Sequence, residues 1–131
     1  MTTTGNLTNF GDLNNLWFGG GAASNAGRAV YGGGQISPTK TNTIEYVTIA
    51  TLSNALDFGD LTVARIYMAT ASSSTRAVWC GGHSDSPADD TELNTMDYVQ
   101  IPSTGNATDF GDLLSALTSI VGASNGHGGL G

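Results

Sequence analysis

The chain has 131 residues, of which 39% are apolar, 11% are charged and 19 are glycine, and its formal net charge is −7. This length suits one domain of ordinary size and excludes two. Eleven acidic residues against four basic ones leave no basic stripe to neutralise phosphates, so we expect no nucleic-acid partner. No apolar run approaches the roughly 18 residues that a bilayer span needs, so we expect no membrane partner. The single cysteine, Cys80, excludes an internal disulfide, and we expect a buried, inert thiol.

One motif, Asx-Phe-Gly-Asp-Leu, occurs three times along the chain. Its phenylalanines are Phe10, Phe58 and Phe110, which are separated by 48 and then 52 residues. A period near 50 residues indicates a repeat architecture, in which each unit buries a face against the next. We therefore predict a single repeat domain over residues 1–131, with units at about 5–52 and 53–104 and a partial unit at 105–131.

The predicted elements of one unit, in chain order, are four short strands. The first is apolar and rich in small residues, and its three copies are residues 16–23, 66–72 and 116–124. The second carries Arg-Ala-Val-aromatic followed by glycines, and its two copies are residues 24–34 and 72–82. The third alternates along residues 44–50 and 96–102 and contains a tyrosine, Tyr46 or Tyr98. The fourth carries the repeated phenylalanine.

Apolar residues on both faces of residues 44–50 predict a strand that is buried on both sides. For residues 116–124 a short helix is the alternative, because Leu113, Leu117 and Val121 have helical spacings, but the position in the repeat favours a strand. The composition, rich in Thr, Ser, Asn and Gly, also favours strands and turns over helices. The predicted fold class is all-β.

The repeated motif has a structural interpretation at each of its positions. Its phenylalanines are expected to pack unit against unit, its glycines to adopt a turn conformation, and its second acids to accept backbone N–H bonds in that turn. The glycines are Gly11, Gly59 and Gly111, and the acids are Asp12, Asp60 and Asp112. Asp-Phe-Gly also occurs in protein kinases, but no phosphate loop accompanies it here.

Two arginines, Arg28 and Arg76, occupy equivalent places in the second predicted strand. We predict that each pairs with a repeated acid such as Asp12 or Asp60, which gives an ion pair between neighbouring units. The alternative is that these arginines contact a ligand.

Residues 83–92 concentrate one histidine and four acids. We expect a solvated loop; binding of a hard cation such as calcium is the alternative, although the glycine and spacing of an EF-hand are missing. The two histidines, His83 and His127, stand in no recognisable nucleophile or zinc arrangement. We therefore predict no catalytic residue, no cofactor and no metal, and expect that the protein is not an enzyme.

The order of these segments resembles the kelch-type repeat of β-propellers. Residues 32–34 and 81–82 match its glycine motif, and Tyr46 and Tyr98 match the aromatic that follows. The amino-acid sequence of residues 104–113 is similar to that of kelch-like repeats in virion proteins of marine bacteriophages, notably those that infect cyanobacteria. The resemblance implies propeller-like blades and a structural role in the virion, as a tail, neck, fibre or capsid component made in the host cytoplasm.

Two complete units with overhanging halves cannot close a propeller, which needs about four to eight blades. We therefore expect a homo-oligomer in which subunits complete one another as a ring or a filament, together with other virion proteins. The alternative function is a module that binds a host glycan or protein through the variable loops at residues 35–43 and 83–95. Neither loop contains an aromatic residue for sugar stacking, which favours the structural role.

Overall fold

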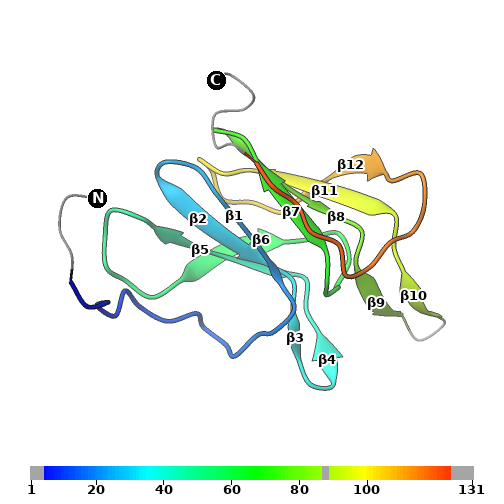
Figure 1. The fold of residues 1–131 in the computed structure, drawn as a ribbon, viewed down its shortest axis with the longest axis horizontal. Helices are drawn as coiled ribbons and strands as arrows, with labels where there is room; N and C mark the ends of the chain where they lie inside the picture. Colours follow the sequence, from blue (N-terminus) through cyan, green and yellow to red (C-terminus); the bar gives the residue numbers. More distant parts are fainter. Residues whose placement is uncertain (1–4, 87–88, 125–131) are drawn as a thin grey trace.

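The computed structural model describes residues 5–86 and 89–124, in which every regular element is a β-strand (Figure 1). No helix in these two ranges is long and apolar enough to cross a membrane. The strands form two four-stranded antiparallel sheets that follow each other along the chain. The strands of the first sheet, in spatial order, are β1 (Gly21–Ser24), β2 (Arg28–Gly32), β5 (Thr43–Thr48) and β6 (Leu56–Asp60). Those of the second are β7 (Ala69–Ser72), β8 (Arg76–Cys80), β11 (Thr95–Gln100) and β12 (Thr108–Asp112).

A short hairpin is inserted between the second and third strands of each sheet. The hairpin strands are β3 (Gln35–Ile36) and β4 (Thr39–Lys40) in the first unit, and β9 (His83–Ser86) and β10 (Asp89–Glu92) in the second. An isolated bridge joins each hairpin to the segment that precedes the first strand of the same sheet, Phe18 to Gln35 before β1 and Ile66 to His83 before β7. The predicted loop at residues 83–92 is therefore wrong, because β9 and β10 pair with each other, but its acids Asp85 and Glu92 are exposed to solvent as expected.

The all-β prediction is confirmed, and so is the four-strand unit in both complete copies. The end copies differ from the prediction. Residues 9–13 around Phe10 and residues 113–124 form neither a strand nor a helix. A strand forms only where its backbone pairs with a second strand over several residues. Residues 9–13 make only single contacts, such as the hydrogen bond that the Ala55 amide donates to the Asp12 carbonyl.

In its second and third copies the Phe-Gly-Asp motif belongs to a strand, so the predicted turn is wrong there. Phe58, Gly59 and Asp60 belong to β6, where Phe58 is the extra residue of a β-bulge opposite Ile44 and Glu45 of β5. Phe110 is the equivalent extra residue in β12, opposite Met96 and Asp97 of β11. Gly59 has a φ of 146°, and a Cβ there would collide with the backbone of the loop before β12. Glycine is therefore required by both conformation and space.

The second acid of the motif does not accept the bond that we predicted. The amides of Asp12 and Asp60 instead donate to the side-chain oxygens of Asn54 and Asn106, at 3.0 and 3.1 Å. These asparagines are the residues four positions ahead of the next phenylalanine. The motif thus joins each unit to the loop before the fourth strand of the next unit.

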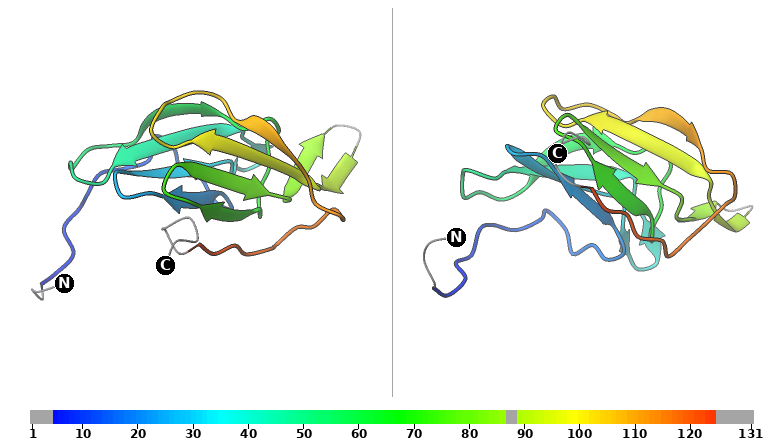
Figure 2. Two further views of the ribbon diagram at one scale, coloured as in Figure 1. Left: turned by 90° about the horizontal axis from the view of Figure 1, so that it is seen from above. Right: turned by 45° about the horizontal axis from the view of Figure 1, so that its top comes forward.

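The two sheets lie face to face (Figure 2). One apolar core of buried side chains lies between them. Trp79 is fully buried, and its ring nitrogen donates to the Gly21 carbonyl at 3.0 Å. The first strands of the two sheets, β1 and β7, lie side by side, because Thr70 and Ser72 donate to the carbonyls of Ala22 and Ser24. The core therefore lies between the sheets.

We predict different costs for removing the same ring at two equivalent places. Phe58→Ala should lower the free energy of unfolding by about 3–5 kcal/mol, because Phe58 is 2% exposed. Phe110→Ala should cost about 1 kcal/mol, because Phe110 is 51% exposed. Urea unfolding at low protein concentration measures both values. Equal costs would contradict the packing described above.

Candidate functional site

The contact between the two sheets is the most extensive buried site in the described residues, and its two sides can be defined by strand register. We call the side of the first sheet that carries Val30, Ile44, Tyr46 and Phe58 its front face. The back face of the second sheet meets it and carries Ala77, Trp79, Asp97, Val99 and Ile101. Apart from Tyr46, which is half-buried, all these side chains are at most 3% exposed. The front of one unit is thus closed by the back of the next.

Arg28 crosses this contact without forming the predicted ion pair. Its guanidinium donates to the carbonyls of Ile101 and Pro102 at 3.1 and 3.0 Å, and it lies 4.6 Å from the ring centre of Tyr46. Tyr46 in turn meets Phe58 edge to face at 5.7 Å between ring centres. The predicted pairs with Asp12 or Asp60 are wrong, since the ion pairs within residues 5–86 and 89–124 are Lys40–Asp85 and Arg65–Asp97.

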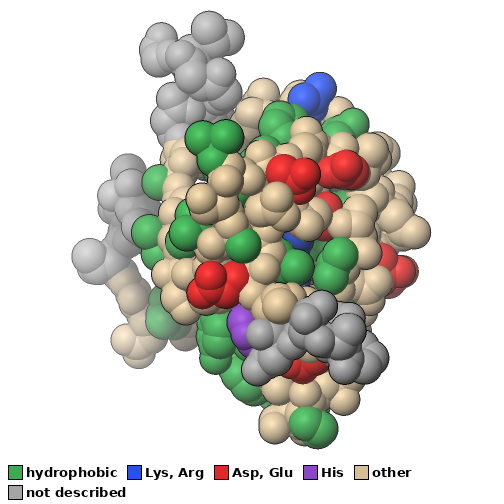
Figure 3. Space-filling model, turned by 90° about the vertical axis from the view of Figure 1, so that its right-hand side faces the viewer, with side chains coloured by type: hydrophobic (Ala, Val, Ile, Leu, Met, Phe, Trp, Pro, Cys, Tyr) green, Lys and Arg blue, Asp and Glu red, His purple; other side chains and the backbone are tan. Residues whose placement is uncertain are grey.

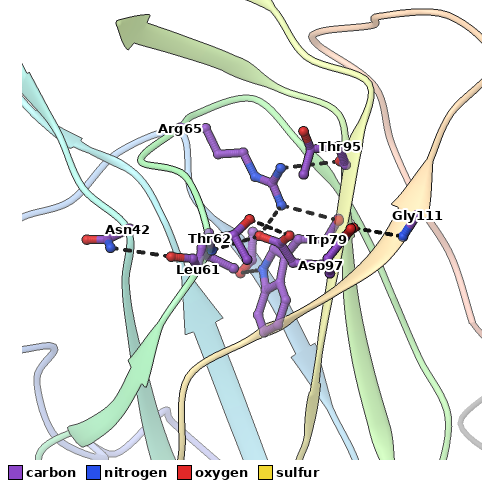
Figure 4. A network of polar contacts seen from close by, with 10 residues as sticks. Asn42, Leu61, Thr62, Arg65, Trp79, Thr95, Asp97 and Gly111 are labelled. Atoms are coloured by element: carbon purple, nitrogen blue, oxygen red, sulfur yellow. Dashed lines mark hydrogen bonds and ion pairs between the residues drawn. The ribbon is translucent and has the colours of Figure 1, made fainter.

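The ion pair at the centre of the contact is one that the sequence did not reveal. Arg65, from the segment between the sheets, lies 2.8 Å from the Asp97 carboxylate on β11, and both side chains are 0% exposed (Figure 4). The amide and hydroxyl of Thr62 donate to the same carboxylate at 3.0 and 2.6 Å. Arg65 also donates to the carbonyls of Thr95 and Trp79. The pair therefore ties the connecting segment to β8 and β11.

The electrostatics of this pair follow from its burial. Desolvation lowers the pKa of Arg65, and the adjacent Asp97 carboxylate opposes that shift. The Nε atom of Arg65 is buried without a hydrogen-bond partner. Hydrogen bonds to Thr62 and to carbonyls satisfy most of the remaining polar groups, which a buried pair needs in order to be tolerated. The pair fixes how the segment crosses the sheet.

The equivalent acid of the first sheet, Glu45, has no arginine. Glu45 is 2% exposed and accepts a bond from the Asn14 amide at 3.2 Å, as Asp97 does from Thr62. The residue that stands at the place of Arg65 in the earlier copy is Trp17. A recurring acid before the repeated tyrosine was the only sequence signal for this site, and the arginine that completes it does not recur.

Both sides of the sheet contact have copies on the free surfaces of the molecule. The front face of the second sheet carries Val78, Met96, Tyr98 and Phe110, none of which is buried. Tyr98 and Phe110 keep the edge-to-face contact at 5.8 Å, and Arg76 lies 5.2 Å from the Tyr98 ring centre. Unlike Arg28, Arg76 is exposed. The second unit thus repeats the arrangement of the first on an open face.

The back face of the first sheet is also open, except at Glu45, which is buried. It carries Ala29, Tyr31 and Val47, which are half-buried, while Ile49 is 44% exposed. A hollow of about 130 Å³ lies between this face and Leu13. Burial raises the pKa of Tyr31, whose hydroxyl accepts a bond from the Gly20 amide at 3.1 Å. This face has the residue types of the buried back face of the second sheet.

The structure places the remaining predicted residues at the two ends of the repeat. Phe10 is half-buried, and Gly11 lies against the Ser53 backbone at the place that Gly59 takes in the next unit. Gly111 has no such neighbour, and Asp112 ends β12 in an exposed position. The predicted residues therefore do not form one site; they form three copies of one contact, of which the copy at Phe58 is closed by a whole sheet.

A second hollow, of about 390 Å³, lies beside the two hairpins. Lys40 lines it, and its ammonium contacts the Asp85 carboxylate and lies 2.9 Å from His83 Nδ1. Figure 3 views this end of the molecule and shows acidic side chains at several separate places. Within the described residues no three His, Cys, Asp or Glu side chains converge to hold a metal ion. His127 lies outside the described residues.

No known protein family model matches the chain, and no curated protein is significantly similar to it.

We predict that breaking the buried pair is costly and that replacing it is less so. Arg65→Met and Asp97→Asn should each lower the free energy of unfolding by about 3–5 kcal/mol, because each leaves an unpaired buried group. The double variant Arg65→Met, Asp97→Asn should lose less than the sum of the two single losses. Urea unfolding of all three measures the coupling. Lys40→Met is the control and should cost about 1 kcal/mol or less, because Asp85 is 45% exposed; additive losses at Arg65 and Asp97 would contradict the pairing.

We also predict slow chemistry at Cys80, which is half-buried. Burial raises the pKa of its thiol, and the nearby Arg65 only partly offsets this. A raised pKa leaves less thiolate at any pH below it, so labelling by a disulfide reagent should be slower in the folded chain than in urea. Its rate should also reach half of its maximum at a higher pH. Equal profiles for folded and unfolded chain would contradict the raised pKa.

Proposed function

We propose that this protein is a non-enzymatic structural component of a phage virion that acts by assembling with copies of itself. The observation that carries the proposal is the open pair of faces, since each repeats one side of a contact that is fully buried inside the chain. An apolar face with a built complement elsewhere on the same molecule favours head-to-tail association. The protein then works through packing rather than chemistry.

The virion assignment is supported by the sequence of the repeats, which is similar to that of kelch-like repeats in marine phage virion proteins. The two sheets are proposed to be β-propeller-like blades that are completed between subunits. The particle component is a tail, neck, fibre or capsid decoration, with other virion proteins as further partners. The exposed Phe110 and Ile49 are the side chains proposed to become buried on assembly.

A non-enzymatic role agrees with the chemistry of the hollows. The ammonium of Lys40 is already engaged by Asp85 and lies next to His83, so these groups neutralise one another. The second candidate function is recognition of a host glycan or protein at this place, favoured by the hollow between the hairpins. Its lining includes Pro38, Thr39 and Ser84 but no aromatic ring.

We predict a solution mass above the 13.3 kDa of one chain, rising with protein concentration, when the purified protein is measured by light scattering behind a sizing column. Phe110→Ser should lower the mass toward one chain, because it removes an apolar ring from an open face. Ile36→Ser is the matched control, since Ile36 is 42% exposed on a hairpin outside both faces. A monomer at every concentration would overturn the assembly role.

The virion assignment is tested by a separate experiment, immunolabelling of phage particles. Antibodies against the purified chain should label intact particles of the encoding phage at a fixed position under the electron microscope. Particles that lack the chain would overturn the virion assignment and leave self-assembly standing.

A further inference from the structure

The two open faces match the buried contact residue by residue. On the front side, Val30, Tyr46 and Phe58 recur unchanged as Val78, Tyr98 and Phe110, and Ile44 recurs as Met96. On the back side, the buried Ala77, Trp79, Asp97, Val99 and Ile101 correspond to Ala29, Tyr31, Glu45, Val47 and Ile49. Every pair keeps its chemical type. The free faces are therefore complementary to each other in the way that the packed ones are.

We propose that copies dock head to tail in the register of the internal sheet contact, so that the second sheet of one copy covers the first sheet of the next. This inference rests on the proposed self-assembly and specifies its geometry. Phe110 of one copy packs on Val47 and Ile49 of the next, as Phe58 lies against the second sheet. Front meets back, so the contact is not self-complementary, and it builds rings or filaments rather than twofold dimers.

The polar contact across the interface follows from the same register. Arg28 donates to the carbonyls of Ile101 and Pro102. Arg76 is already held over the Tyr98 ring in the matching pose. In the docked pair it donates to the carbonyls of Ile49 and Ala50 in the next copy. This contact orders an arginine that is exposed in the single chain.

Docking in this register creates a steric conflict at two places, and at each of them two segments compete for one position. Residues 9–12 lie where β12 of the preceding copy must lie, because they already bond to Asn54 and Ala55 as β6 bonds to Asn106 and Ala107. At the inner side, residues 121–124 lie against β7, where β1 of the following copy must lie, because Ser72 contacts both Ser24 and Ser124. One segment of each competing pair must leave.

Sheet pairing decides which segment leaves. β12 is held by β11, and β1 is held by β2 through four residue pairs. Residues 9–12 and 121–124 belong to no sheet. The incoming β12 restores the hydrogen bonds that residues 9–12 lose, and it brings the burial of a whole face. Residues 9–12 and 121–124 thus cover these positions in the single chain, and β12 and β1 of neighbouring copies displace them on docking.

Two glycines at equivalent positions test this exchange in opposite directions. A Cβ on Gly11 would collide with the Ser53 backbone, so Gly11→Ala should expel residues 9–12 and strengthen assembly. In the single chain Gly111 has only the end of Met96 near it, at 4.0 Å, but in the docked pair it meets Ser53 of the next copy. Gly111→Ala should weaken assembly by about tenfold or more. The φ values, 151° and 132°, make comparable backbone strain in both variants.

A mixing experiment tests the polarity. Phe110→Glu spoils the front face and Val47→Glu spoils the back face, so each variant alone should remain a monomer. An equimolar mixture should give a complex of two chains and no larger species, because each variant keeps one intact face. Far-ultraviolet circular dichroism and urea unfolding verify that both variants fold; Val47→Ser replaces Val47→Glu if the latter does not.

The outcomes separate this geometry from the proposed function. Opposite effects of the two glycine variants together with a two-chain mixture support docking in the internal register. If the parent chain assembles but the mixture stays monomeric, or if both glycine variants act alike, the register is wrong and self-assembly stands. A parent chain that is monomeric at every concentration overturns both.

Discussion

The structure depends on one constraint: a four-stranded sheet of this repeat can bury its front face only against the back face of another unit. Val30, Ile44 and Phe58 reach near-zero exposure because Trp79, Val99 and Ile101 lie opposite them. This apolar contact is the main source of stability, since few charges and no disulfide contribute. Where no further unit follows, the same side chains remain open. The association that we propose would therefore use the same kind of contact that stabilises the single chain.

The buried ion pair contributes orientation more than energy. Arg65 and Asp97 lie at the point where the segment between the sheets crosses the second sheet. Removing two charges from water roughly cancels their attraction, so such a pair adds little net stability. It does disfavour other crossings, because any shift of the segment would leave both charges unpaired. The first sheet, which has Glu45 without an arginine, lacks this restraint.

The sequence predicted the repeated interior of the fold well, because two complete copies share the same alternation and the same glycines. It failed at the ends, where Phe10 and residues 113–124 have the pattern of a strand but no neighbouring strand to pair with. It also misjudged Gly59, since glycine followed by aspartate is typical of turns, whereas the bulge depends on the paired strand β5. Arg65 has no copy in the repeat, so its pairing could not be inferred from periodicity.

The four extra residues of the second unit lie entirely in its hairpin. β9 and β10 have four residues each, where β3 and β4 have two, while the flanking sheet strands keep the same lengths in both units. Length changes at this place therefore leave the sheet register untouched. A peptide inserted between β3 and β4 should therefore leave both four-stranded sheets and the contact between them unchanged.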